Sequence, residues 1–177
     1  MLERLTIDNA DELQQLLERC SDYFQMCEDG PARPDAARTE LTTVPPGRSM
    51  DDLFVFGVRD DARQLIGTNT MIRNWPRKSE EWWLAFQAID PAHRGRGVGT
   101  AMYREVEAFV VAHGGRVIQA SVIERNSGAE RFWRRIGFRE IERQDYTAPS
   151  GWKTRVIMMR RDVSPDAPSI TIPPQSQ

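Results

Sequence analysis

The chain reads DPAHRGRGVGT over residues 90–100, and the patterns on either side of this stretch set the order of the elements around it. An apolar run before it, Trp82–Ile89, is short enough for a buried strand covered on both faces. After it, apolar residues recur at helical spacing until Gly114-Gly115, a typical C-terminal helix signal; they are Met102, Val106, Phe109 and Val110. The sequence therefore predicts a strand, a glycine-rich loop and a helix.

This order favours binding of a phosphate group. The first-turn amides of a helix lack intrahelical partners, and the helix dipole adds partial positive charge there. Glycine allows close approach to the backbone, and Arg94 and Arg96 add full charges. A dinucleotide-binding Gly-x-Gly-x-x-Gly fingerprint is not met, because Thr100 stands at the third glycine position; a Walker A loop is not met either, because lysine is missing. Taken alone, the loop is also compatible with a structural turn.

Patterns farther out complete a mixed α/β domain. A strand at Met1–Ile7 is followed by a helix that Asp8 or Asn9 caps, whose apolar stripe runs from Leu13 to Cys27. We predict a short helix over 35–43 and strands over 53–58 and 64–73, then a strand over 117–123, a helix around 129–136, and strands over 138–141 and 152–159 around the Pro149-Ser150-Gly151 turn. Residues 1–163 are expected to form the domain, and 164–177 a proline-rich tail without regular structure.

The composition narrows the class of protein. The 177 residues are 40% apolar and 28% charged, as in one soluble domain. The net charge of −2 argues against a nucleic-acid partner, while an acidic first third beside a basic middle favours an anionic ligand in the middle. No apolar run reaches the ~18–20 residues that span a bilayer, so we expect no membrane partner and a cytoplasmic location.

Neither the cysteines nor the histidines predict a metal site. Cys20 and Cys27 both fall on the apolar stripe of the first helix, which favours a core role over a disulfide or a thiolate ligand. His93 and His113 are 20 residues apart and belong to no ligand motif. We expect no metal.

A second motif follows one strand after the glycine loop, and the two together resemble the GNAT family, the GCN5-related N-acetyltransferases. The family's Arg/Gln-x-x-Gly-x-Gly/Ala loop is matched at Arg94, Gly97 and Gly99. Its Asn…Ala…Phe-aromatic…Gly-Phe signature is matched at Asn126, Ala129, Phe132, Trp133, Gly137 and Phe138. The resemblance implies a mixed, mostly antiparallel sheet of six to seven strands, with a splayed parallel central pair and about four flanking helices.

The resemblance also implies that acetyl-coenzyme A lies between the strands 82–89 and 117–123. Its diphosphate would accept hydrogen bonds from the loop amides. Its pantetheine arm would form hydrogen bonds with backbone groups of Ala88 and Ile89, and with Asn126 from the other strand. Asn126 is equally suited to cap the last helix. The residues implied in coenzyme binding are Ala88, Ile89, Arg94, Gly95, Arg96, Gly97, Val98, Gly99, Thr100, Asn126, Phe132 and Trp133.

The catalytic groups are less well defined. Many relatives carry a tyrosine where Trp133 stands, and an indole N–H donates a hydrogen bond without surrendering a proton. Tyr146, expected in the loop between the last two strands, is the substitute acid, and Glu81 at the start of the central strand is the first choice of base. Asp22 and Tyr23 would flank the substrate mouth. Ordinary packing or surface roles compete for each of these residues.

The function implied by the resemblance is acetyl transfer from acetyl-coenzyme A to a primary amine by direct attack in a ternary complex. A small-molecule amine is the favoured acceptor, with a protein N-terminus or lysine as the alternative. A non-catalytic acyl-coenzyme A-binding module is the rival from another class, which Trp133 keeps open. Homodimers are common in the family, so the oligomeric state stays open.

Overall fold

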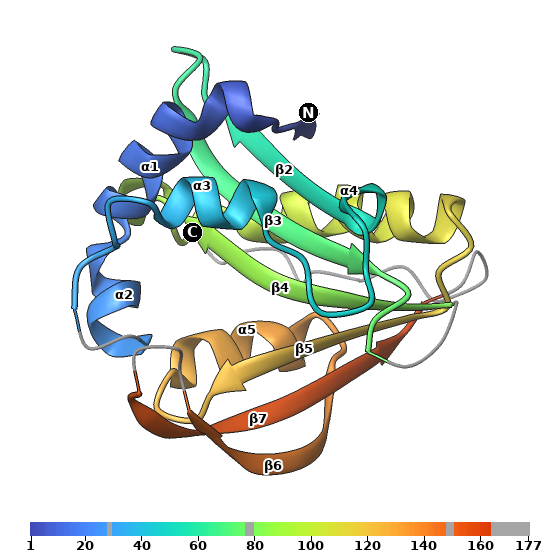
Figure 1. Ribbon diagram of the computed structural model, residues 1–177. Helices are drawn as coiled ribbons and strands as arrows, with labels where there is room; N and C mark the ends of the chain where they lie inside the picture. The colour runs from blue at the N-terminus through green and yellow to red at the C-terminus, as the bar shows by residue number, and fades with distance from the viewer. Residues whose placement is uncertain (28–29, 77–79, 148–150, 164–177) are drawn as a thin grey trace, which may run out of the picture.

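The computed structural model describes residues 1–27, 30–76, 80–147 and 151–163 (Figure 1). Its strands are β1 (Glu3–Arg4), β2 (Leu53–Arg59), β3 (Leu65–Arg73), β4 (Glu81–Ile89), β5 (Val117–Ile123), β6 (Arg139–Thr147) and β7 (Lys153–Asp162). Its α-helices are α1 (Ala10–Arg19), α2 (Ser21–Cys27), α3 (Ala36–Thr42), α4 (Val98–Ala112) and α5 (Ser127–Arg135). Short 3-10 turns lie at η1 (Ile7–Asn9), η2 (Met50–Asp52) and η3 (Pro91–His93).

The strands form one seven-stranded sheet in the order β1-β2-β3-β4-β5-β7-β6. Only β4 and β5 pair in parallel among the described strands; the other neighbours are antiparallel. The mixed sheet with a parallel central pair is thus confirmed, with five α-helices within the described residues where about four were predicted. A doubly wound dinucleotide-binding sheet would instead be mostly parallel.

Helices cover both faces of the sheet (Figure 1). On one face, α1 and α3 enclose a core with β2, β3 and β4. On the other, α4 and α5 pack on β4, β5 and β7, where Trp82, Tyr103 and Ile157 are fully buried. Burial on both faces explains why the first half of β4 is so apolar, as predicted for a central strand; β3 is equally buried although it carries Thr68, Asn69 and Thr70.

The first long helix predicted over the Leu13–Cys27 stripe is two helices. They meet at Cys20, whose ψ of 29° leaves the helical range and whose N–H is shared between the carbonyls of Leu16 and Leu17. The apolar stripe continues across this break, so its period gave no sign of it. Cys20 and Cys27 are buried thiols that form no disulfide, and burial raises the pKa of Cys20, in agreement with a core role.

The N-terminal strand is shorter than predicted. Only Glu3 and Arg4 pair with β2, and the chain then turns into η1. A capping box at Thr6 causes the turn: the Thr6 side chain accepts from the Asp8 N–H, and the Asn9 side chain accepts from the Thr6 N–H. Asn9 therefore stabilises η1 and makes no side-chain cap on α1.

The last two strands are longer than predicted. β6 continues to Thr147 and β7 to Asp162, so Tyr146 lies on a strand and not in the loop where it was expected. Ile141 is the only aliphatic residue of β6, because this edge strand is largely exposed, and an exposed strand lacks the apolar alternation that sequence patterns detect. Residues 148–150 of the predicted turn and the predicted tail over 164–177 lie outside the described residues.

None of the described helices combines the length and the apolarity that a membrane span requires. Within the same residues, no cluster of three or more histidine, cysteine or carboxylate side chains has the arrangement of a metal site.

Candidate active site

The site is built where β4 and β5 separate. Their parallel pairing runs from Glu81 opposite Val117 to Leu84 opposite Ala120 and then stops. At this point β4 carries a β-bulge, because β3 pairs Met71 with Leu84 but Thr70 with Phe86, which leaves Ala85 as the extra residue. Beyond the bulge the two strands diverge toward their C-terminal ends, and α2 lies near the opening (Figure 1).

The bulge also exchanges the faces of β4. Before it, Trp82 and Leu84 point to the core beneath α4; after it, Phe86 and Ala88 lie on the α1 side, and Ile89 packs near α4. One extra residue has this effect because strand side chains alternate with a period of two. The second half of β4 therefore presents a different set of side chains to the gap.

A cavity of about 710 Å³ occupies this gap. Its wall comes from α2, the end of β4, the glycine loop, the first turn of α4, and α5 with its flanking residues. The lining residues are Asp22, Tyr23, Met26, Gln87, Ala88, Ile89, Arg94, Gly95, Gly97, Val98, Gly99, Thr100, Asn126, Gly128, Ala129, Phe132, Trp133, Arg135 and Ile136. Thirteen of the sixteen residues predicted for coenzyme, catalysis or substrate are among them, and the other three are Glu81, Arg96 and Tyr146.

The glycine loop delivers backbone amides to this cavity. Gly95 and Gly97 have φ values of 75° and 83°, in the region that favours glycine, and no atom lies within 4 Å of the position that a Cβ would take on either. Gly97 caps α4 without a side chain, and the first bond of the helix runs from the Ala101 N–H to the Gly97 carbonyl. The amides of residues 98–100 therefore lack intrahelical acceptors, as an anion site requires.

Arg94 is held by α2. Its two terminal nitrogens donate to the Asp22 carboxylate, one of them at 3.0 Å, and its Nε donates to the Ile89 carbonyl at 2.8 Å. The hydrogen bond from Arg94 lowers the pKa of the Asp22 carboxyl from its ordinary value. Asp22 was expected to attract an acceptor amine, but its carboxylate is engaged by Arg94. It is also the only carboxylate among the described residues that line the cavity.

Asn126 and Trp133 line the cavity from the β5 side. The Asn126 Oδ1 accepts from the Ala129 N–H at 3.0 Å, so the capping role is confirmed, and the side chain still borders the cavity. Trp133 is 6% exposed and contacts Tyr103 and Phe138 edge to face. Its packing role is clear, and its role toward the coenzyme sulfur stays a prediction.

Glu81 and Tyr146 lie outside the cavity. Glu81 starts β4, six residues before Gln87, the first β4 residue that lines the cavity, which at ~3.3 Å per residue separates their backbones by roughly 20 Å. Its carboxylate is buried, accepts a hydrogen bond from Gln119 Nε2 at 3.2 Å and lies 3.9 Å from Arg160. Tyr146 is 43% exposed on β6. The geometry gives the base and acid roles predicted for these residues no support.

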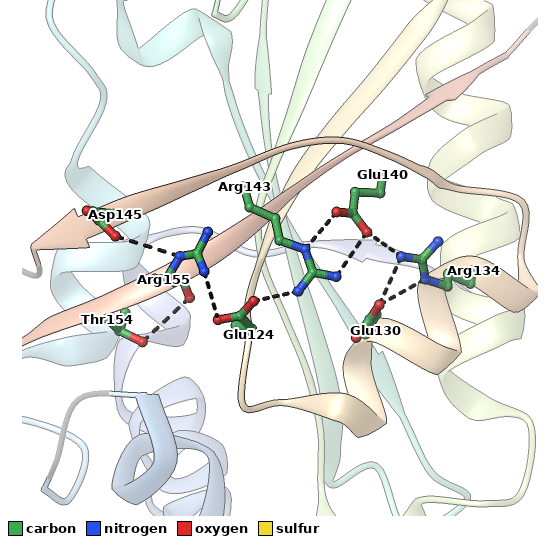
Figure 2. A network of polar contacts seen from close by, with 8 residues as sticks. All are labelled: Glu124, Glu130, Arg134, Glu140, Arg143, Asp145, Thr154 and Arg155. Carbon is green, nitrogen blue, oxygen red and sulfur yellow. Dashed lines mark hydrogen bonds and ion pairs between the residues drawn. The ribbon is translucent and has the colours of Figure 1, made fainter.

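A network of charges fixes the segment that carries Asn126 (Figure 2). Arg143 on β6 donates to Glu140 and to Glu124, two residues before Asn126, while Arg134 on α5 donates to Glu130 and Glu140. Hydrogen bonds from Arg143 and Arg134 lower the pKa of Glu140. The network ties α5 and the β5–α5 loop to the edge of the sheet.

Six residues that line the cavity had no site role predicted from the sequence: Met26, Gln87, Gly128, Ala129, Arg135 and Ile136. Ala129 belongs to the second motif, and Gln87 carried a usable signal as a polar residue near the end of an otherwise apolar strand. Arg135 lies in the last turn of α5, where its guanidinium approaches the Phe132 ring at 5.9 Å. A basic residue in that turn also suits the helix dipole, so its sequence position did not single it out.

Comparison with known proteins agrees with this geometry. The sequence model of the acetyltransferase (GNAT) family matches residues 11–138. An uncharacterised N-acetyltransferase of Methanocaldococcus jannaschii is 39% identical over 54 residues, a match that covers 30% of this chain and 24% of that protein.

Solved structures share the fold over nearly the whole chain. An acetyltransferase from Thermus thermophilus superposes with a TM-score of 0.72 at 20% identity, over 92% of this chain and 97% of that one. The ribosomal-protein-S18-alanine N-acetyltransferase from Escherichia coli gives 0.69 at 14% identity, over 97% and 99%. At these identities the likeness concerns the fold alone.

Proposed function

The chain belongs to the GNAT acetyltransferase family, and from this membership we propose that it transfers the acetyl group of acetyl-coenzyme A to a primary amine. One observation carries the proposal: beyond the point where β4 and β5 part, a cavity lined by the end of β4 on one side and by Asn126 and α5 on the other reaches the free amides at the start of α4. An acyl donor whose anionic end binds these amides would place its thioester toward the bulge.

The residues present suit such a donor. The α4 amides and the dipole of that helix complement a diphosphate, and the backbone of Ala88 and Ile89 borders the path of the pantetheine arm. Arg94 contributes positive charge beside the loop while its Asp22 partner holds it in place. Phe132 and Arg135 offer an aromatic face and a cation at the other wall.

In the proposed reaction, the lone pair of a neutral amine attacks the thioester carbonyl carbon. A backbone N–H near the β4 bulge stabilises the oxyanion, the C–S bond then breaks, and the thiolate leaves. The proton from the amine passes to water, because no lining carboxylate is free within the described residues. Trp133 can donate its indole N–H to the departing sulfur, and binding both reactants together accounts for much of the acceleration.

We favour a small-molecule amine as the acceptor, and the support comes from α2. Tyr23 lines the cavity and meets Phe86 of β4 edge to face at 5.3 Å, with Phe24 in the same aromatic group. Tyr23 is the one ring of these three that lines the cavity, and we infer that it narrows the approach beside the bulge. An amine on a small molecule passes such an opening more readily than one on a folded protein surface.

A non-catalytic acyl-coenzyme A-binding module is the second candidate, favoured by the indole of Trp133 and by the distance of Glu81 from the cavity. Both candidates predict that acetyl-coenzyme A raises the melting temperature. They differ in release of free coenzyme A thiol with a panel of small amines, amino acids, polyamines and peptides. Amine-dependent thiol release supports the enzyme, binding without release supports the module, and failure to bind contradicts both.

A further inference from the structure

Gln87 presents a side-chain amide to the cavity from the second half of β4. It follows the bulge and therefore points to the α4 side, where the earlier half of the strand placed Trp82 and Leu84. Its neighbours on β4 are apolar, so the amide is an exception in this strand. Its Nε2 lies 3.7 Å from the position that a Cβ would take on Gly99, in the first turn of α4.

Asn69 holds this amide in one orientation. It stands opposite Gln87 on β3, and its Nδ2 donates to Gln87 Oε1 at 2.9 Å. Because the Gln87 oxygen is occupied by Asn69, the Nε2 group remains available as a donor on the side of α4. The pair thus sets which end of the amide faces the cavity.

The position of Asn69 has an energetic cost. The residue is fully buried, and its Oδ1 has no hydrogen-bond partner among the described residues. Burying an unsatisfied amide oxygen is unfavourable, and two apolar side chains of similar size would avoid this cost at the same place in the sheet. Packing alone therefore does not account for the pair.

We propose that Gln87 binds the diphosphate of the acyl donor through Nε2, as a side-chain donor added to the α4 amides, and that Asn69 is a positioning residue that orients it. This inference rests on the proposed use of acetyl-coenzyme A. It assigns a further recognition role to a residue that the sequence motifs do not include, and it chooses the diphosphate because the Gln87 amide lies beside Gly99 and not beside the bulge.

The deciding experiment is calorimetric binding of coenzyme A to the wild type and to Gln87→Leu, which keeps the side-chain volume and removes the donor. A lost bond to a charged group should weaken binding on the order of tenfold. Gln87→Glu should weaken it further, because a carboxylate would face the diphosphate. Gln144→Leu, a glutamine on β6 outside the cavity, is the matched control and should leave binding unchanged.

Pantetheine, which lacks the diphosphate, tests where the contact falls. Its binding, measured by competition at high concentration, should be equal for the wild type and Gln87→Leu. A loss equal to that seen with coenzyme A would overturn the diphosphate assignment, and unchanged coenzyme A binding in Gln87→Leu would overturn the role of Gln87. If the wild type itself binds no coenzyme A, the proposed function fails instead.

A double-mutant cycle tests Asn69. Asn69→Leu should weaken coenzyme A binding in the wild-type background and have no further effect when Gln87 is already leucine. A merely structural role would lower affinity equally in both backgrounds, and that result would overturn the positioning role. Melting temperatures of the wild type, both single variants and the double variant show whether all four are folded. If Asn69→Leu does not fold, the binding of coenzyme A by Gln87→Leu still tests the role of Gln87.

Discussion

Asp22 on α2 and Arg94 at the start of the glycine loop form a bidentate ion pair in the wall of the cavity. The pair connects the helix beside the acceptor approach to the loop that would bind the donor. Planar two-point contacts of this kind fix orientation as well as distance. The charge of Arg94 is consequently shared between Asp22 and any anion that binds the loop.

Replacing Asp22 with asparagine should strengthen acetyl-coenzyme A binding several-fold at low salt. The substitution leaves Arg94 with its full positive charge beside the loop, and the gain should shrink as salt screens that charge. Titration calorimetry at two ionic strengths measures both effects. Asp11→Asn, an exposed carboxylate on α1, is the control, and weaker binding by Asp22→Asn would contradict the prediction.

The same pair predicts a pH dependence of stability. Since Arg94 lowers the pKa of Asp22 in the folded state, the contribution of the pair is present above the unfolded carboxyl value of about 3.8 and is lost as the pH falls through the lower folded value. The melting temperature of the wild type should exceed that of Asp22→Asn near neutral pH, and the gap should close in acid. Both side chains are partly exposed, so the gap is small; a gap that widened in acid would oppose this assignment.

Gly97→Ala should weaken both the fold and donor binding. The φ of 83° costs a residue with a Cβ roughly 1–2 kcal/mol, although there is space for the methyl group itself. Relaxation of this strain would turn the α4 amides away from the cavity. Thermal unfolding and coenzyme A binding measure the two effects, with Gly30→Ala as the control at a glycine without a positive φ.

Glu81→Gln separates the structural role of that residue from the catalytic one. A general base is worth ~10²–10⁴-fold in rate, whereas a carboxylate outside the cavity should change kcat by no more than about twofold. We expect the small change, together with a modest loss of stability because Gln119 and Arg160 lose a charged partner. A hundredfold fall in kcat with an unchanged fold would restore the base role.

Arg143→Gln should raise the KM for acetyl-coenzyme A about two- to fivefold with little change in kcat, because the weak contacts of an exposed network are lost together. The contact between Arg143 and Glu124 is drawn in Figure 2, and its loss frees the segment that leads to Asn126. The wild-type KM should rise with salt more steeply than that of the variant. Arg139→Gln on the same strand, whose partner is Asp162, is the control, and an equal effect there would argue against a specific link.

Predictability from the sequence followed burial. Both ends of β5 were predicted correctly, because both faces of the strand are buried and glycines precede it. The glycine loop was predicted because its positive φ values require glycine, which is visible in the sequence. The α1–α2 break escaped because the apolar stripe continues through Cys20, and the length of β6 escaped because it is exposed. The position of Glu81 relative to the cavity escaped for another reason: it depends on where β4 and β5 stop pairing, which is a property of the two strands together, and the role of Glu81 as base stays a prediction.

The extra residue at Ala85 shifts the alternation of side chains along β4 by one residue. If the same residues paired in regular register, every later side chain would change sides, sending Gln87 toward α1 and bringing Phe86 beneath α4. A relative without this insertion has one residue fewer here, and an alignment that places the gap after Gln87 would equate residues on opposite sides of the sheet. Mutations designed in the second half of β4 should therefore preserve the bulge, in which Leu84 pairs with Met71 and Phe86 pairs with Thr70.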